Sequence, residues 1–179
     1  MKISGAIFDM DGTLINSLHF WEEYFYEIGM KYASNPSFLP DGDTLKRMRT
    51  LTIGDGQRLL YERYGFGADA SELVNFAYEK CEYFYRNLVT MKDGVIELLD
   101  FLKENKVPMC IASATERRLL EIAVERFGFD KYFPIVVSCS DVGHGKERPD
   151  VFVRAKRFWA RSLTARLCLR IRSLRSKHR

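Results

Sequence analysis

Residues 3–15, ISGAIFDMDGTLI, decide the fold of this chain of 179 residues. The run from Ile3 to Phe8 is short and mostly apolar, which predicts a buried strand. Asp9 follows this strand directly, and the turn-forming stretch DGT follows at residues 11–13. The first strand is therefore expected to place acidic side chains at its carboxyl end.

The sequence after residue 93 alternates between helical and strand patterns. The four segments, in order helix, strand, helix and strand, are VIELLDFLKEN (95–105), VPMCIAS (107–113), ERRLLEIAVERFG (116–128) and PIVVSCS (134–140). Such alternation with short connections predicts an α/β fold with a parallel sheet covered by helices. Ligands of open parallel sheets bind at the carboxyl ends of the strands, where Asp9, Ser113 and Ser140 are expected.

Residues 16–90 are predicted to form an all-helical block that interrupts the sheet after its first strand. Apolar residues recur at helical spacing from residue 18 to residue 32, with Asn16 or Ser17 as the expected cap. Thr52 and Asp69 are further expected helix starts, each with a carboxylate three residues later. A block inserted at this point is placed to act as a lid.

The formal net charge of +4 hides two different kinds of sequence. Residues 1–150 carry 18 basic and all 24 acidic residues, whereas residues 151–179 carry ten basic residues and no acid. No run reaches the roughly 18 apolar residues of a membrane span, and acids follow the start where a signal peptide would be apolar. We expect a cytoplasmic protein with no membrane span, whose four cysteines lack CxxC spacing and are free buried thiols.

Asp9 and Asp11 are the candidate catalytic residues. Two carboxylates held this close need a cation, and the simplest is an oxygen-bound Mg²⁺. One carboxylate then serves as nucleophile toward a phosphate, and the other moves the proton. Gly12 allows close approach of the backbone and Thr13 adds a hydroxyl. Read without further motifs, the same pattern also fits an Asp-Gly turn or a calcium loop.

Three motifs in order resemble those of the haloacid dehalogenase (HAD) superfamily. FDMDGTL at residues 8–14 is similar to the nucleophile motif, and IASAT at residues 111–115 to the Ser/Thr motif. GKERPDVF at residues 145–152 is similar to the lysine motif. The resemblance implies Asp9 as nucleophile, Asp11 as acid/base, and Mg²⁺ bound by both. It also implies phosphoryl binding by the Ser113 hydroxyl, the Ala114 N–H and Lys146.

The resemblance extends to the domain organisation. It implies a Rossmann-like core from residues 1–15 and 91–156, with a helical cap at residues 16–90, as in the phosphoglucomutase and phosphoglycolate phosphatase branch. Substrates of that branch are small phosphorylated sugars and related metabolites. Thr13 favours a phosphatase over a β-phosphoglucomutase-like phosphoryl transfer. His19 resembles a histidine that faces the substrate cleft in relatives, although a surface or hinge histidine is an open alternative.

The resemblance stops near residue 157. The family continues with a fourth strand that ends in paired acids of the magnesium site, but residues 157–179 contain no acid. We therefore expect an incomplete core, a first strand left at the sheet edge, and a chain of weak activity. Asp141 is the alternative acid that could complete the site.

Two hypotheses compete for residues 157–179. In the first, a basic amphipathic helix binds an anionic membrane, an acidic protein or nucleic acid, which would make the chain a non-catalytic polyanion binder. Its apolar positions are Ala155, Trp159, Leu163, Leu167, Ile171 and Leu174. In the second, favoured hypothesis, this segment is translated out of frame, because residues with six codons (Arg, Leu and Ser) dominate it. No nucleic-acid partner is then expected.

The frame hypothesis predicts that the coding DNA, read in another frame from about codon 154 onward, encodes an acidic continuation of the phosphatase. Translation of both alternative frames should reveal an apolar strand that ends in paired Glu or Asp. If neither frame contains it, the tail is native, and salt-dependent binding to anionic lipid or nucleic acid becomes the favoured explanation.

Overall fold

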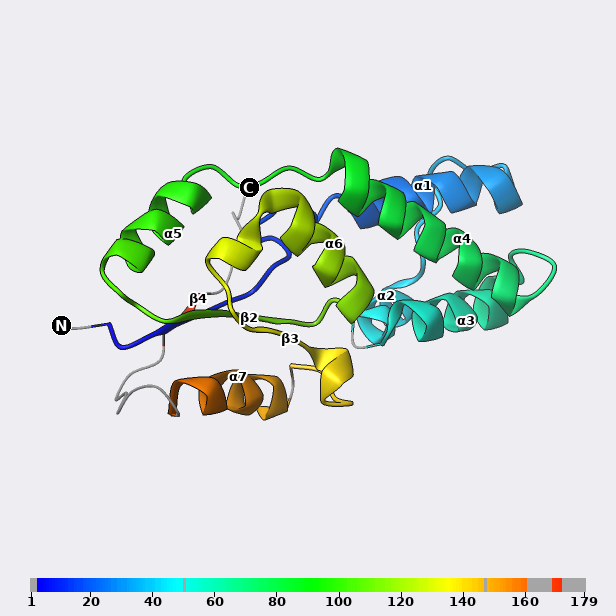
Figure 1. The fold of residues 1–179 in the computed structure, drawn as a ribbon. Coiled ribbons are helices and arrows are strands. Elements are labelled where there is room, and N and C mark those ends of the chain that lie inside the picture. Colours follow the sequence, from blue (N-terminus) through cyan, green and yellow to red (C-terminus); the bar gives the residue numbers. More distant parts are fainter. Residues whose placement is uncertain (1–2, 50, 147, 161–168, 172–179) are drawn as a thin grey trace. The chain divides into compact units, whose positions relative to one another are not determined.

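The computed structural model describes residues 3–49, 51–146, 148–160 and 169–171 (Figure 1). The described residues form two compact units. One unit is built from Met1–Ser17 and Val89–Arg179, and the other from Leu18–Leu88. The first contains the sheet and the second is helical, so each is described by itself.

The sheet of the first unit has four parallel strands in the order β3-β2-β1-β4. Their bounds are β1 (Ala6–Phe8), β2 (Met109–Ser113), β3 (Val136–Ser138) and β4 (Leu169–Ile171). Ile7 pairs with Cys110 of β2, and Ala112 pairs with Val137 of β3. The predicted α/β class with a parallel, Rossmann-like sheet is confirmed.

Helices cover both faces of this sheet (Figure 1). Their bounds are α5 (Val95–Glu104), α6 (Arg117–Phe127) and α7 (Asp150–Ala160). The first two lie on one face and α7 lies on the other. The four segments predicted between residues 95 and 140 are α5, β2, α6 and β3, each of the expected type, although the strands are shorter than expected.

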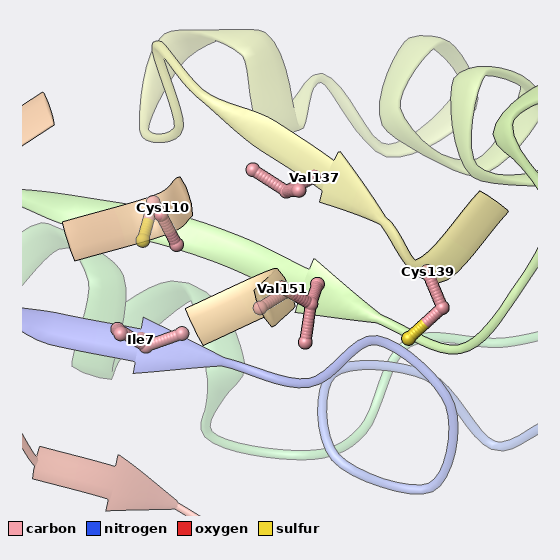
Figure 2. Packing of buried hydrophobic residues seen from close by; sticks show 7 residues of the cluster. Ile7, Cys110, Val137, Cys139 and Val151 are labelled. Atoms are coloured by element: carbon pink, nitrogen blue, oxygen red, sulfur yellow. The ribbon is translucent and has the colours of Figure 1, made fainter. Parts of the chain in front are cut away.

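The face toward α7 is packed with small and branched apolar side chains (Figure 2). The buried cluster consists of Ile7, Cys110, Ala112, Val137, Cys139, Val151 and Ala155. Neighbouring strand residues point to opposite faces, so Phe8 lies on the other side, where its ring meets Phe133 edge-on at 5.5 Å. Burial on both faces explains the nearly continuous apolar pattern of β1 and β2.

Two expectations about the C-terminal segment are wrong. The first strand is not at the sheet edge, because β4 pairs with it in parallel, with Phe8 opposite Ile171. Nor does one helix run through the tail, since α7 ends at Ala160 and Ile171 belongs to a strand. Leu169 and Ile171 stand on either side of Arg170, a spacing of two that suits a strand. Leu163, Leu167 and Leu174 lie outside the described residues.

The second unit contains four α-helices and a π-helical turn at Phe84–Leu88. The helices are α1 (Phe20–Ala33), α2 (Gly42–Met48), α3 (Ile53–Tyr64) and α4 (Ala70–Tyr83). The caps predicted at Thr52 and Asp69 are confirmed, since their side chains accept from the N–H groups of Asp55 and Glu72. Both bonds satisfy backbone donors that a helix start leaves free.

The cap predicted for the first helix is wrong. His19 occupies the cap position of α1 without a side-chain bond to the helix. Asn16 does not cap the helix and bonds to Thr90. Its backbone N–H donates to the Thr90 carbonyl at 2.8 Å, and its side-chain amide donates to the Thr90 hydroxyl at 3.1 Å. Ile15 also bridges to Met91. These contacts hold together the two chain segments that lead into and out of the helical unit.

Three of the four cysteines are described, and all three are buried thiols outside any disulfide, as predicted: Cys81, Cys110 and Cys139. Cys168 lies outside the described residues. Within the described part of the chain, none of the helices has the length and apolar character needed to cross a membrane.

Glu72 ties α4 to α1 in the helical unit. Its carboxylate accepts the Ala68 N–H at 2.8 Å, the Tyr32 hydroxyl at 2.8 Å and the Lys31 ammonium at 3.3 Å. The Ala68 N–H, followed by the hydroxyl and the ammonium, lowers the pKa of Glu72 to about 2. Hydrogen bonds to the charged form favour that form.

Glu72→Gln should lower the thermal unfolding midpoint at pH 7 and should do so less as the pH falls. A carboxyl whose pKa is depressed on folding contributes stability above the unfolded value near 4.5, and this contribution disappears as the pH falls through about 2. Circular dichroism melts between pH 7 and pH 2 measure the difference. Exposed Glu62 supplies the control, Glu62→Gln. If the difference in unfolding midpoint between wild type and Glu72→Gln stayed the same from pH 7 to pH 2, the lowered pKa of Glu72 would be contradicted.

Candidate active site

The loop after β1 is a tight turn built on one carbonyl. The Met10 carbonyl accepts the N–H groups of Thr13, Leu14 and Ile15 at 3.2, 2.9 and 3.2 Å. Gly12 has a φ of +69°, a conformation that L side chains rarely adopt. The glycine therefore lets the chain turn back at once after the strand.

Asp9 lies at the carboxyl end of β1 and forms an ion pair with Lys146. The Lys146 Nζ lies 2.5 Å from Asp9 Oδ2, and both side chains are partly buried, with 19% and 33% of their surface exposed. Asp9 Oδ1 accepts the Met10 N–H at 2.9 Å. The structure thus brings together two predicted site residues, one from the motif at residues 8–14 and one from the motif at residues 145–152.

Asp11 is held by two hydroxyl groups. Ser17 Oγ donates to Asp11 Oδ1 at 2.6 Å, and Thr115 Oγ1 donates to Oδ2. One donor lies on the segment leading to the helical unit and the other follows β2. Both oxygens of this carboxylate therefore have a partner, and its orientation is fixed from two sides.

Ser113 is the last residue of β2 and is 1% exposed. Its hydroxyl donates to Thr115 Oγ1 at 3.2 Å and accepts the Thr115 N–H at 3.2 Å. Ala114, which follows it, is exposed. The residues predicted to bind phosphate from β2 thus lie beside the hydroxyl that holds Asp11.

Asp141 lies three residues after the end of β3 and forms an ion pair with Arg117. The guanidinium contacts both carboxylate oxygens, with Nε 3.1 Å from Oδ1, and the Ser138 N–H donates to Oδ2 at 2.8 Å. Burial raises the pKa of Asp141, but Arg117 and the Ser138 N–H outweigh it, so the pKa lies below its ordinary value. This carboxylate anchors the start of α6 to β3.

His19 belongs to the helical unit, where its ring meets Phe84 edge-on at 5.4 Å. The side chain is exposed. Its predicted phosphate contact therefore stays a prediction. Thr13, another predicted contact, is half-buried in the turn after β1.

The sequence prediction missed Ser17, Thr115 and Arg117. Ser17 was assigned to a helix cap, and Thr115 lies within IASAT but attracted no role. Arg117 is one of two consecutive arginines on a helix surface, so nothing in the pattern marks it. For Thr115 the available sign was its hydroxyl two positions after the predicted site residue Ser113.

A sequence profile of the haloacid dehalogenase-like hydrolases matches residues 3–159. The chain belongs to this family. The match begins at the predicted first strand, includes the helical unit and ends within α7.

Several relatives are known phosphatases. The chain is 27% identical over 155 residues to the chloroplastic 5-amino-6-(5-phospho-D-ribitylamino)uracil phosphatase of Arabidopsis thaliana, covering 84% of this chain and 40% of the plant protein. It is 23% identical over 151 residues to the phosphorylated carbohydrates phosphatase of Thermotoga maritima, covering 84% and 68%. The chain thus spans less than half of the plant relative and about two thirds of the bacterial one.

The fold agrees with that of solved structures. A Thermotoga maritima protein described as a β-phosphoglucomutase superposes with a TM-score of 0.71 at 20% identity, covering 93% of this chain and 74% of that one. At this identity the likeness establishes the fold alone. Family membership rests on the profile match to residues 3–159 and not on this likeness.

Asp141→Asn should destabilise the sheet unit by about 2 kcal/mol, because it leaves the Arg117 guanidinium without its charged partner. Urea unfolding measures the loss. Glu121→Gln is the matched control, since Glu121 is 4.0 Å from the same arginine and its side chain is 66% exposed. That change should cost well under about 1 kcal/mol. Equal losses for both variants would show that Asp141 has no special structural role.

Proposed function

We propose that the chain hydrolyses a small phosphate monoester through an aspartyl-phosphate on Asp9, with Mg²⁺ as cofactor. The observation that carries the proposal is the ion pair between Asp9 and Lys146 at the carboxyl end of β1. A carboxylate nucleophile repels a phosphate dianion, and a lysine at this distance offsets that repulsion.

Asp9 forms the covalent intermediate. One of its carboxylate oxygens attacks phosphorus, and the ester P–O bond breaks. Asp11 gives its proton to the departing alcohol oxygen. Asp11 then takes a proton from water, whose oxygen attacks phosphorus and breaks the bond to Asp9, releasing inorganic phosphate.

The remaining site residues bind the phosphoryl group. Lys146 compensates the charge shared by Asp9 and the phosphoryl oxygens, and the Ser113 hydroxyl and Ala114 N–H donate to those oxygens. The turn at Gly12 and Thr13 allows backbone and hydroxyl contacts from the opposite side. These groups bind charge that increases in the transition state, so they act mainly on kcat.

Mg²⁺ fits the donors at the end of β1. Asp9 and Asp11 supply two carboxylates, and Mg²⁺ typically uses one or two carboxylates with waters and substrate phosphate oxygens. Among the described residues no group of three or more His, Cys, Asp or Glu side chains surrounds such a site. Bound there, Mg²⁺ would offset the negative charge of the Asp9 carboxylate and of the substrate dianion.

The helical unit is proposed to select the substrate. Caps of this kind exclude water and contact the leaving group. The named relatives act on phosphorylated carbohydrates and on a ribityl phosphate, which supports a sugar phosphate or related metabolite as substrate. His19 at the start of α1 is a proposed contact to it.

Asp9→Asn should lower Mg²⁺-dependent phosphate release by at least about 100-fold, because an amide oxygen is a poor nucleophile. Asp11→Asn should cost about 100- to 10,000-fold, the range of general acid–base catalysis. Release of phosphate from a panel of sugar phosphates, with and without EDTA, measures both. Retention of most activity by Asp9→Asn would refute the mechanism.

Matched variants separate charge from folding in this test. Ser113→Ala and Lys146→Ala should lose about 100- to 1,000-fold in kcat. Lys156→Ala, on the exposed side of α7, removes the same charge away from Asp9 and should retain activity. Appearance of an isomeric sugar phosphate without free phosphate would instead identify a mutase.

A further inference from the structure

Thr115 is the point at which three parts of the sheet unit meet. Its hydroxyl donates to Asp11 Oδ2 and accepts from Ser113 Oγ at 3.2 Å. Its carbonyl accepts the Ser138 hydroxyl at 2.7 Å. Thr115, two residues after the end of β2, therefore connects the loop after β1 with the end of β3.

Support from β3 fixes this connection. Ser138 is fully buried, and its hydroxyl accepts the Ser140 N–H at 3.1 Å while it bonds to Thr115. The Thr115 N–H donates to Ser113 Oγ at 3.2 Å. With its N–H and carbonyl both bonded, Thr115 has little freedom of backbone rotation, so its hydroxyl stays directed at Asp11.

The two hydroxyls that bind Asp11 differ in their attachment. Ser17 lies on the segment that leads to the helical unit, whereas Thr115 is bonded to two sheet strands. A contact made from the sheet keeps its position relative to Asp9 when the connecting segment moves. Thr115 is therefore the donor that fixes the position of the Asp11 carboxylate relative to Asp9.

We propose that Thr115 is a positioning residue that sets the direction of the Asp11 carboxylate for proton transfer. The catalytic part of this inference rests on the proposed function. A general acid must lie within hydrogen-bond distance of the leaving oxygen, and a misplacement of about 1 Å costs on the order of 100-fold. Phosphoryl binding by Ser113 is a separate role.

Thr115→Val replaces the hydroxyl with a methyl group of similar size, and Thr115→Ser keeps the hydroxyl. With a sugar phosphate, Thr115→Val should lower kcat by about 10- to 100-fold with little change in KM, whereas Thr115→Ser should stay within about threefold of the wild type. Circular dichroism melts of the full-length variants check that both fold.

p-Nitrophenyl phosphate separates positioning of Asp11 from phosphate binding. Its leaving group departs without a proton, so only hydrolysis of the aspartyl-phosphate needs Asp11. Thr115→Val should release close to one equivalent of p-nitrophenolate per chain in a burst and then turn over slowly, with phosphate trapped on Asp9. Slow turnover without a burst would overturn the proposal, because the phosphorylation step would then be the one impaired. Unchanged turnover would overturn it as well.

A measurement without turnover distinguishes failure of this proposal from failure of the proposed function. Three-bond carbon and nitrogen couplings to the Asp11 carboxyl carbon report its χ1 rotamers, and Asp11→Asn assigns the resonance. We expect one dominant rotamer in the wild type and in Thr115→Ser, and averaging in Thr115→Val. A single rotamer in Thr115→Val would refute positioning even if the chain proved to be an enzyme. Averaging in an inactive chain would support positioning and refute the enzymatic mechanism alone.

Discussion

The ion pair between Lys146 and Asp9 is the interaction on which the rest of the site depends. A carboxylate at the end of a buried strand needs a compensating charge, and Lys146 provides it from the loop between β3 and α7. That loop is held in place by the packing of Val151 and Ala155 against the sheet. Apolar packing on one face of the sheet thus helps to place the Lys146 charge next to Asp9 at the carboxyl end of β1.

The second carboxylate is treated differently. The hydroxyl groups of Ser17 and Thr115 donate to Asp11, whereas Asp9 pairs with the ammonium ion of Lys146. Hydroxyls can donate to a carboxylate and can also accept from a protonated carboxyl group, but an ammonium ion can only donate. The two hydroxyls can therefore hydrogen-bond to Asp11 before and after the proton transfer that the proposed acid/base role requires.

The sequence predicted the fold class and the order of elements well because its patterns are local. The alternation of helix and strand from residue 95 to residue 140 and the caps at Thr52 and Asp69 each depend on a few neighbouring residues. The positions of Asp9 and Ser113 at the ends of β1 and β2 followed from the same patterns. Their chemical roles remain predictions that the proposed assays address.

The contacts that the sequence did not reveal are those between residues far apart in the chain. The bond from Thr115 to Asp11 and the pairing of Arg117 with Asp141 depend on strand register, which periodicity does not specify. The placement of β4 beside β1 was missed for a related reason. The spacing of its apolar residues pointed to a helix, whereas the unpaired backbone of β1 favours any segment that can pair with it.

The contacts between Asn16 and Thr90 have a consequence for how the chain folds during synthesis. The first strand leaves the ribosome about a hundred residues before its partner β2, and closing so long a loop costs conformational entropy. Once residues 18–88 have folded, the Asn16 bonds to Thr90 and the bridge from Ile15 to Met91 bring the two flanking segments together. The distance along the chain that β1 and β2 must close then falls to about a quarter. The contacts that join the two segments flanking the inserted helices thus shorten the loop that the pairing of β1 with β2 has to close.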